Sequence, residues 1–176
     1  GAHYNAFTSH ESTGYYASVA PTQALEALEL LAEMYLRPSF PEGEIAKERG
    51  VVIEEINMYE DLPHRLVGEL FMGLVYGNTP AGRPIIGSKE TVQSFGRAAL
   101  VDYHASHYVA PATIVTVAGN FTSAPLLRRI KNLFGETKRG SKPGKPAVIE
   151  QQAAPGFIHR LKSSDQSHFV LGWRGV

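Results

Sequence analysis

The spacing of apolar residues predicts a helix-rich chain. Apolar positions recur three and four residues apart over residues 23–36 and 42–59, which is the period of a helix with one buried face. Arg37-Pro38 ends the first helix, and Pro41 and Glu42 begin the second. Further helices are predicted over 64–76, for a short stretch from Ser88, over 98–109 and over 123–134, with Ser123 as an N-cap.

Extended segments are predicted to form a single sheet. They are residues 4–9, 15–20, 113–118, 157–162 and 168–173. The first two are rich in strand-forming residues and are joined by polar residues, as in a hairpin. Because helices and strands mix without strict alternation, the pattern predicts an α+β fold. In it, a mostly antiparallel sheet carries the helices 23–36 and 42–59 on one face.

The composition is that of an ordinary soluble domain. The 176 residues include 17 basic and 17 acidic ones, and this zero net charge argues against a nucleic-acid partner. No apolar run approaches the roughly 20 residues of a membrane span. The absence of cysteine excludes disulfides and thiolate chemistry and leaves the compartment open, cytoplasm or periplasm. We interpret residues 1–176 as one truncated domain of a longer protein, because neither end resembles a natural terminus.

The helix predicted over 42–59 has a clear apolar face. At about 100° per residue, Ile45, Val52, Ile56 and Tyr59 cluster on one side. This side is expected to pack against the interior.

The glutamates of this helix differ in direction. Glu48 and Glu55 lie on nearly the same side, at the border of the apolar face, whereas Glu54 points nearly opposite, beside Lys47. A carboxylate at such a border needs a cation, a metal or hydrogen-bond donors. Glu48 and Glu55 could therefore pair with arginines or cap backbone amides. They could equally serve a metal, one as a ligand and the other as its orienting neighbour.

The sequence holds no complete catalytic motif. HExxH, HxxEH, GxSxG and phosphate-binding glycine loops are all absent. His104 and His107 are spaced to chelate one ion on a helix, but no glutamate lies between them, and we interpret them as structural or surface residues. The residues alone therefore indicate an incomplete active site.

Several motifs spread along the chain match one known family. They are Asn5-Ala6-Phe7-Thr8-Ser9 with Glu11, Thr13 and Tyr15-Tyr16, then residues 48–55, Asp61-Leu62-Pro63, Pro84-Ile85-Ile86-Gly87, residues 103–120, and Gln166-Ser167-His168. Together they resemble the pitrilysin and insulysin family of zinc metallopeptidases, the inverzincins. This family includes the mitochondrial processing peptidase and many bacterial zinc proteases.

The resemblance implies a zinc site. In this family an HxxEH helix supplies two histidine ligands and the glutamate that activates water, and a downstream glutamate is the third ligand. The resemblance places that third ligand at Glu55 and an auxiliary catalytic glutamate at Glu48, the two residues that the helix periodicity also selects. Counting back from Glu55 places the HxxEH motif before Gly1. The chain would then be an N-terminal-half piece with one zinc ligand of three.

The resemblance also implies a substrate strand. Asn5, Ala6 and Phe7 match the strand along which an extended peptide, or a segment of unfolded protein, adds to the sheet edge. Asn5 could alternatively be a turn residue. The family closes two homologous halves around the peptide, so a second half, on the same or another chain, is an expected partner.

The implied function is part of a zinc-dependent metalloendopeptidase, with this chain inactive by itself. The alternative is a catalytically silent partner subunit of the same family, which clamps peptide or assembles a complex. An unrelated α+β binding domain is a further alternative. An HxxEH motif upstream of Gly1 would distinguish the peptidase from the silent subunit.

Overall fold

In the computed structural model, which describes residues 1–142, 144–148, 152–163 and 165–173, the chain forms two compact units. The first comprises Gly1–Glu42 and Gly96–Gly144. The second comprises Gly43–Phe95 and the described residues from Lys145 onward.

A β-hairpin begins the first unit. Strands β1 (His3–Thr8) and β2 (Thr13–Ser18) pair in antiparallel register, with Phe7 opposite Gly14. The turn between them is closed by the Ser9 N–H, which donates to the Ser12 carbonyl over 2.8 Å. The Phe7 ring covers Gly14 so closely that an added Cβ would lie 2.4 Å from it. The hairpin predicted from residues 4–9 and 15–20 is confirmed.

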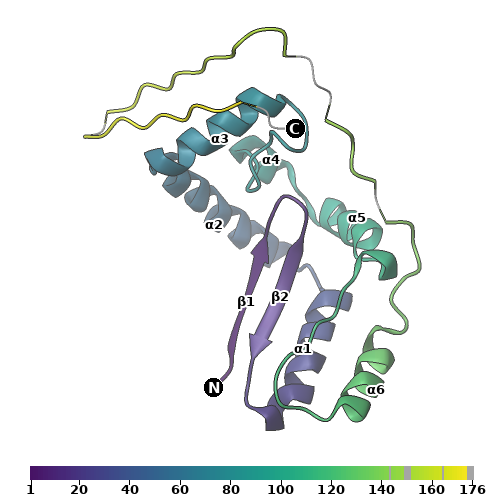
Figure 1. Ribbon diagram of the computed structural model, residues 1–176. Helices are drawn as coiled ribbons and strands as arrows, with labels where there is room; N and C mark the ends of the chain where they lie inside the picture. Colours follow the sequence, from purple (N-terminus) through teal and green to yellow (C-terminus); the bar gives the residue numbers. More distant parts are fainter. Residues whose placement is uncertain (143, 149–151, 164, 174–176) are drawn as a thin grey trace. The chain divides into compact units, whose positions relative to one another are not determined.

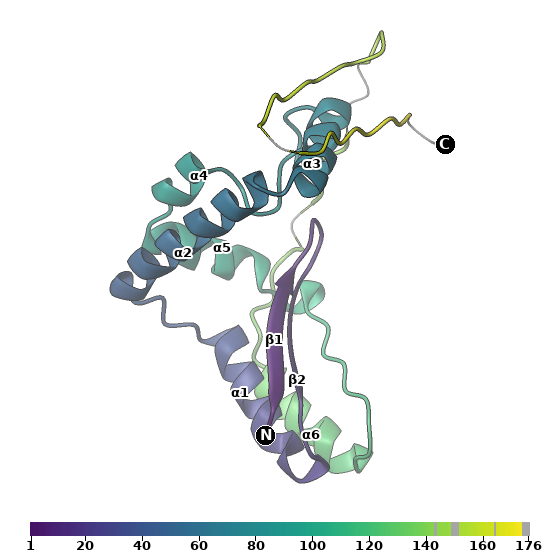
Figure 2. The same cartoon turned by 90° about the vertical axis from the view of Figure 1, so that its left-hand side faces the viewer.

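Helix α1 (Ala24–Leu36) covers one face of this hairpin. After the 3₁₀ turn η1 (Pro21–Gln23), helix α1 packs against β2 and against α6 (Ser123–Phe134) (Figures 1 and 2). The unit also contains α5 (Arg97–His107) and the 3₁₀ turn η2 (Ala110–Ala112). Leu28, Ala32, Val109 and Leu126 are its buried apolar residues. The predicted helices 23–36, 98–109 and 123–134 are thus confirmed, with α5 ending earlier than predicted.

The predicted cap at Ser123 is wrong. Thr122 has the extended backbone of an N-cap residue, whereas Ser123 already lies within α6. The Thr122 side chain forms no capping hydrogen bond with the first turn of α6.

An aromatic cluster ties α1 to α5 and to the segment that follows α5. The Tyr35 ring lies 6.2 Å from that of Tyr15 and 4.8 Å from that of Tyr108, and its hydroxyl is hydrogen-bonded to Thr113 over 2.7 Å. His104 donates from Nε2 to the Tyr35 carbonyl over 2.7 Å. Burial, followed by the hydrogen bond to Tyr15, raises the pKa of the Tyr108 phenol well above its ordinary value. This cluster fixes the C-terminal end of α1.

Helices dominate the second unit. They are α2 (Glu42–Glu60), α3 (Pro63–Tyr76) and α4 (Lys89–Ser94), as predicted. Gly77 ends α3 with a φ of 59°, which favours glycine. The later extended chain contacts α3, since Gly156 lies against Leu74 and Gly172 against Phe71. Among the described residues, no helix has both the length and the apolar character to cross a membrane.

The single five-stranded sheet predicted from the sequence is wrong. Within the described residues, 113–118, 157–162 and 168–173 form no strand ladder, and the sheet has two strands. Ile114 is 90% exposed and Trp173 is 83% exposed. A strand requires a second strand to take up its backbone hydrogen bonds, and composition does not supply that partner. The α+β class and the antiparallel pairing are confirmed, as is the packing of 23–36 on the sheet. The packing of 42–59 on it stays a prediction.

Candidate functional site

Helix α2 buries the face that its periodicity predicts. Ile56 is buried, and Ile45, Val52 and Tyr59 are half-buried. Glu48 and Glu55, which the helix period places at the border of this face, therefore lie beside its buried residues.

Glu55 has the most organised surroundings of these glutamates. It is half-buried, and the Tyr59 hydroxyl one turn later donates to its Oε1 over 2.6 Å. The Arg65 guanidinium lies 4.4 Å from the centre of the Tyr59 ring. Among the described residues no donor binds the other carboxylate oxygen, Oε2. One oxygen is thus held in place, and no residue that the structure describes binds the other.

Glu48 and Glu54 are both exposed, and within the described part of the chain neither forms an ion pair or a side-chain hydrogen bond. Arg49, which follows Glu48, donates instead to the Phe95 carbonyl over 2.6 Å. The interpretation that Glu48 and Glu55 pair with arginines or cap amides is therefore not realised in the described residues. Glu55 instead accepts a hydrogen bond from the Tyr59 phenol.

The C-terminal end of α2 is held by two lysines. Lys89 pairs with Glu60 at 2.7 Å, and the Lys162 Nζ lies 2.6 Å from both the Glu60 carbonyl and Asp61 Oδ1. Cations there satisfy the last carbonyls and favour the helix dipole. Beside this end lies a cavity of about 230 Å³, lined in part by Tyr59 and Lys89. The turn that carries Glu55 and Tyr59 is therefore anchored within the second unit.

The Lys162 contact makes a pH-dependent prediction for Asp61. The hydrogen bond from Lys162, followed by the charge of Lys162, lowers the pKa of the Asp61 carboxyl in the folded protein. This pair therefore stabilises the fold at pH values above the unfolded pKa of about 3.9. The stabilisation is lost as the pH falls through the pKa of Asp61 in the folded protein. In Lys162→Met we expect the Asp61 pKa to rise toward its ordinary value, measured by NMR titration of the side-chain carboxyl. Lys47→Met, which removes the partner of Glu44, is the control and should leave Asp61 unchanged. An unaltered Asp61 pKa in Lys162→Met would contradict the assignment.

The predicted substrate residues lie on an exposed strand. Asn5, Ala6 and Phe7 are all exposed in β1, and Asn5 stands opposite Tyr16 within the strand, so the alternative of a turn residue is wrong. The Asn5 Oδ1 accepts the Ala6 N–H over 2.8 Å, so this N–H points away from β2. Among the described residues no strand pairs with the outer edge of β1. Such an edge can take up an extended peptide.

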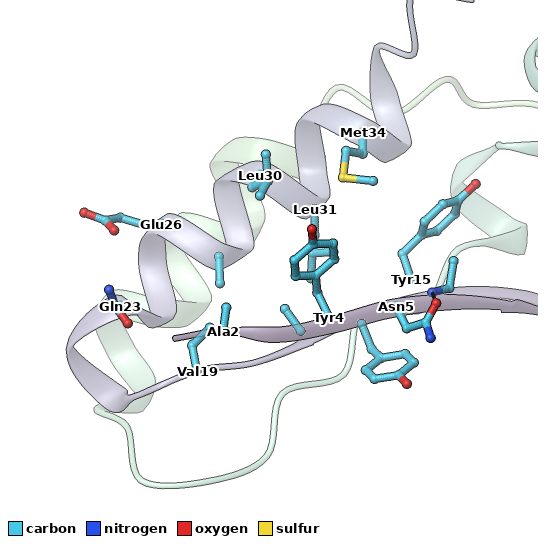
Figure 3. A pocket seen from close by; sticks show the side chains of 14 residues that line it. Ala2, Tyr4, Asn5, Tyr15, Val19, Gln23, Glu26, Leu30, Leu31 and Met34 are labelled. Atoms are coloured by element: carbon cyan, nitrogen blue, oxygen red, sulfur yellow. Dashed lines mark hydrogen bonds between the residues drawn. The ribbon is translucent and has the colours of Figure 1, made fainter. Parts of the chain in front are cut away.

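A groove of about 620 Å³ is lined by residues of this hairpin and of α1. Figure 3 shows Tyr4 and Tyr15 of the hairpin and Met34 of α1 directed toward this space. Asn5 and Ala6 also border it. The candidate substrate strand therefore has an open edge and an apolar groove beside it.

The donor set near Glu55 fits zinc only in part. Zinc accepts carboxylate oxygens, and a catalytic zinc takes three protein ligands. The described residues contain no group of three or more His, Asp or Glu side chains able to hold a metal ion. Glu55 thus offers one suitable ligand. The sequence also predicts that Glu55 and Glu48 face a cleft that the strand with Asn5, Ala6 and Phe7 borders. The structure does not test this prediction, because the strand belongs to the other unit.

His104 and His107 are structural, as interpreted from the sequence. His104 binds the Tyr35 carbonyl and stacks on Tyr108 at 4.3 Å. His107 stacks on Tyr103 at 3.9 Å. The two imidazoles therefore serve separate contacts.

The sequence missed the contact between Tyr59 and Glu55. Periodicity placed Tyr59 only on the apolar face. Its separation of four residues from Glu55 is the signal that points to a contact, because residues so spaced are neighbours on a helix.

Comparison with known proteins identifies the family. The description "Insulinase (Peptidase family M16)" matches residues 1–89, and "Peptidase M16 inactive domain" matches residues 94–176. The chain is 37% identical over 180 aligned residues to the "Uncharacterized zinc protease YmxG" of Bacillus subtilis, covering 100% of this chain and 42% of that protein. It is also 37% identical over 149 residues to the mitochondrial-processing peptidase subunit beta of Bos taurus, covering 83% of this chain and 30% of that protein. The chain therefore belongs to the insulinase family of peptidases, M16.

Two solved structures of proteases superpose on this chain. A protease from Helicobacter pylori superposes with a TM-score of 0.75 at 26% identity, over 86% of this chain and 37% of that one. The periplasmic protease PqqL from Escherichia coli shares the fold, with a TM-score of 0.71 at 21% identity over 85% of this chain and 17% of that one. The pitrilysin-type resemblance is confirmed, and the alternative of an unrelated binding domain is wrong. The chain spans less than half the length of the curated relatives it matches.

Proposed function

We propose that this chain is part of a zinc-dependent metalloendopeptidase that hydrolyses peptide bonds in extended peptides, with Glu55 as the third zinc ligand. The observation that carries the proposal is the half-buried Glu55 carboxylate. Tyr59 holds one of its oxygens, and the other has no hydrogen-bond partner among the described residues. The names of the relatives support it, since several are called zinc proteases. Glu55 would hold zinc there together with ligands from elsewhere in the protein, and bound zinc would supply a water of lowered pKa as the nucleophile.

The remaining ligands are proposed to come from an HxxEH helix in the full-length protein. Glu48, seven residues before Glu55 and on nearly the same side of α2, is proposed as an auxiliary glutamate of the site. Glu54 is exposed and takes no part. Residues 1–176 then form one peptidase half-domain, inactive alone, and a second homologous half completes the enzyme.

The substrate is proposed to bind along β1. The outer edge of this strand, which no strand among the described residues pairs with, presents backbone groups of Asn5, Ala6 and Phe7 to an extended peptide. Recognition by main-chain groups suits unfolded substrates of varied sequence, because every peptide offers the same backbone.

A cleavage assay on the full-length protein tests the proposal. Cleavage of an unstructured peptide should stop when a zinc chelator is added and return when zinc is restored. Cleavage that persists in excess chelator would defeat the zinc-peptidase proposal.

A second candidate is a catalytically silent partner subunit of the same family, because the described residues hold no group of three metal-binding side chains. This candidate expects a full-length protein that binds the same peptide, or a homologous subunit, without cleaving it. The absence of cleavage together with peptide binding would establish it.

A further inference from the structure

We infer that Tyr59 is a positioning residue that orients the Glu55 carboxylate toward a metal ion, and that Arg65 holds the Tyr59 ring for this task. The inference rests on the proposed function, since it takes Glu55 as a zinc ligand. It adds two residues that the family motif in this sequence does not single out.

The first step is the hydrogen bond between Tyr59 and Glu55. The hydroxyl-to-Oε1 distance of 2.6 Å is that of a bond to a charged acceptor. Both residues are half-buried and lie one turn apart on α2, so the same helix carries donor and acceptor. The phenol fixes one oxygen of the carboxylate and leaves Oε2 for a metal. Ligating carboxylates commonly have such outer partners.

The second step is the contact between Arg65 and Tyr59. Arg65 lies in the first turn of α3, and its Cζ is 4.4 Å from the Tyr59 ring centre, within the range of a cation–π contact. The connection from α2 to α3 is short, and the Arg65 N–H donates to the Leu62 carbonyl over 3.0 Å. The guanidinium is therefore placed to restrict the ring, and with it the direction of the hydroxyl.

The third step is the comparison of Glu55 with Glu48 and Glu54. Two other glutamates of α2, Glu44 and Glu60, form ion pairs with lysines. Glu48 and Glu54 are exposed, and among the described residues no phenol or cation binds them. The same helix thus orients Glu55 through a phenol, and Glu48 and Glu54 have no such partner among the described residues. This selection of Glu55 does not depend on the family motif.

The test replaces Tyr59 by phenylalanine in the full-length protein. Tyr59→Phe keeps the ring and its contact with Arg65 but removes the hydroxyl. We expect the zinc dissociation constant, measured by competition with a chromogenic chelator, to rise about 10-fold. The melting temperature of the metal-free protein should stay unchanged, and kcat should fall while KM changes little. Arg65→Ala should shift zinc affinity in the same direction by less.

Two further variants make the outcomes distinct. Tyr103→Phe removes a phenol on α5 whose residue is 57% exposed, and should leave zinc affinity unchanged. If Tyr59→Phe binds zinc as tightly as the natural protein while Glu55→Gln binds it weakly, the positioning role is overturned and the proposed function stands. If Tyr59→Phe lowers the melting temperature of the metal-free protein and leaves zinc affinity intact, Tyr59 is structural and the inference also fails. If Glu55→Gln itself binds zinc normally, the proposed ligand, and with it the proposed site, is wrong.

Discussion

Replacing Glu55 by glutamine in the full-length protein is expected to weaken zinc binding by more than about 100-fold, beyond the 10–100-fold typical of outer partners. A neutral amide is a poorer ligand for a dication than a carboxylate. Because a catalytic zinc has three protein ligands, the substitution weakens one third of its protein ligand set. Because Tyr59 holds one oxygen of Glu55, the substitution also disturbs an oriented group. Zinc affinity is measured by competition with a chelator, and activity by kcat/KM for peptide cleavage. We expect zinc affinity and kcat/KM to fall together.

The neighbouring glutamate provides a matched control. Glu54→Gln makes the same chemical change one residue away on an exposed side of α2, and should alter neither zinc affinity nor cleavage. Glu48→Gln is expected to cost less zinc affinity than Glu55→Gln but still to lower the rate, as for an auxiliary group. Full activity in Glu55→Gln would contradict the ligand assignment.

The helices were predictable from the sequence because their signals are local. The pattern over 42–59 became α2 (Glu42–Glu60), and the break at Asp61-Leu62-Pro63 became the connection to α3. Period, capping and proline positions all act within a few residues of one another. Tertiary packing did not need to be known.

The strands divide by where their partners lie. The hairpin of β1 and β2 was predictable because a short polar turn brings its partner next to it. The prediction of a strand over the β-branched run at 113–118 was wrong. β-Branched side chains favour an extended backbone, but they do not specify which strand it pairs with. Ile114, exposed to 90%, shows that burial did not follow either.

The candidate site was predictable as far as helix geometry reaches. The period of 3.6 residues separates Glu55 from Glu54, and the structure leaves Glu55 half-buried and Glu54 exposed. Periodicity does not fix rotamers, so the bond from Tyr59 to Glu55 was not foreseen. The contact of Arg65 also depends on how α3 follows α2, which a helical wheel does not contain.

The 176-residue chain by itself is expected to bind zinc weakly and to cleave no peptide. Its sequence has neither HxxEH nor HExxH, and its described residues hold no group of three metal-binding side chains. A lone carboxylate leaves the zinc without its other protein ligands, and no general base is then aligned with the bound water.

Zinc titration measures the zinc affinity of this chain, and a peptide-cleavage assay with and without added zinc measures its activity. The full-length protein is assayed in the same way for comparison. The full-length protein, with its proposed HxxEH helix, should regain tight zinc binding and chelator-sensitive cleavage together, because the missing ligands and the missing base belong to one motif. Tight zinc binding by the 176-residue chain alone would show that this count of ligands is wrong. Tight zinc binding without cleavage in the full-length protein would favour the silent-subunit alternative. Glu55 would then be a metal ligand in a protein that no longer performs the chemistry.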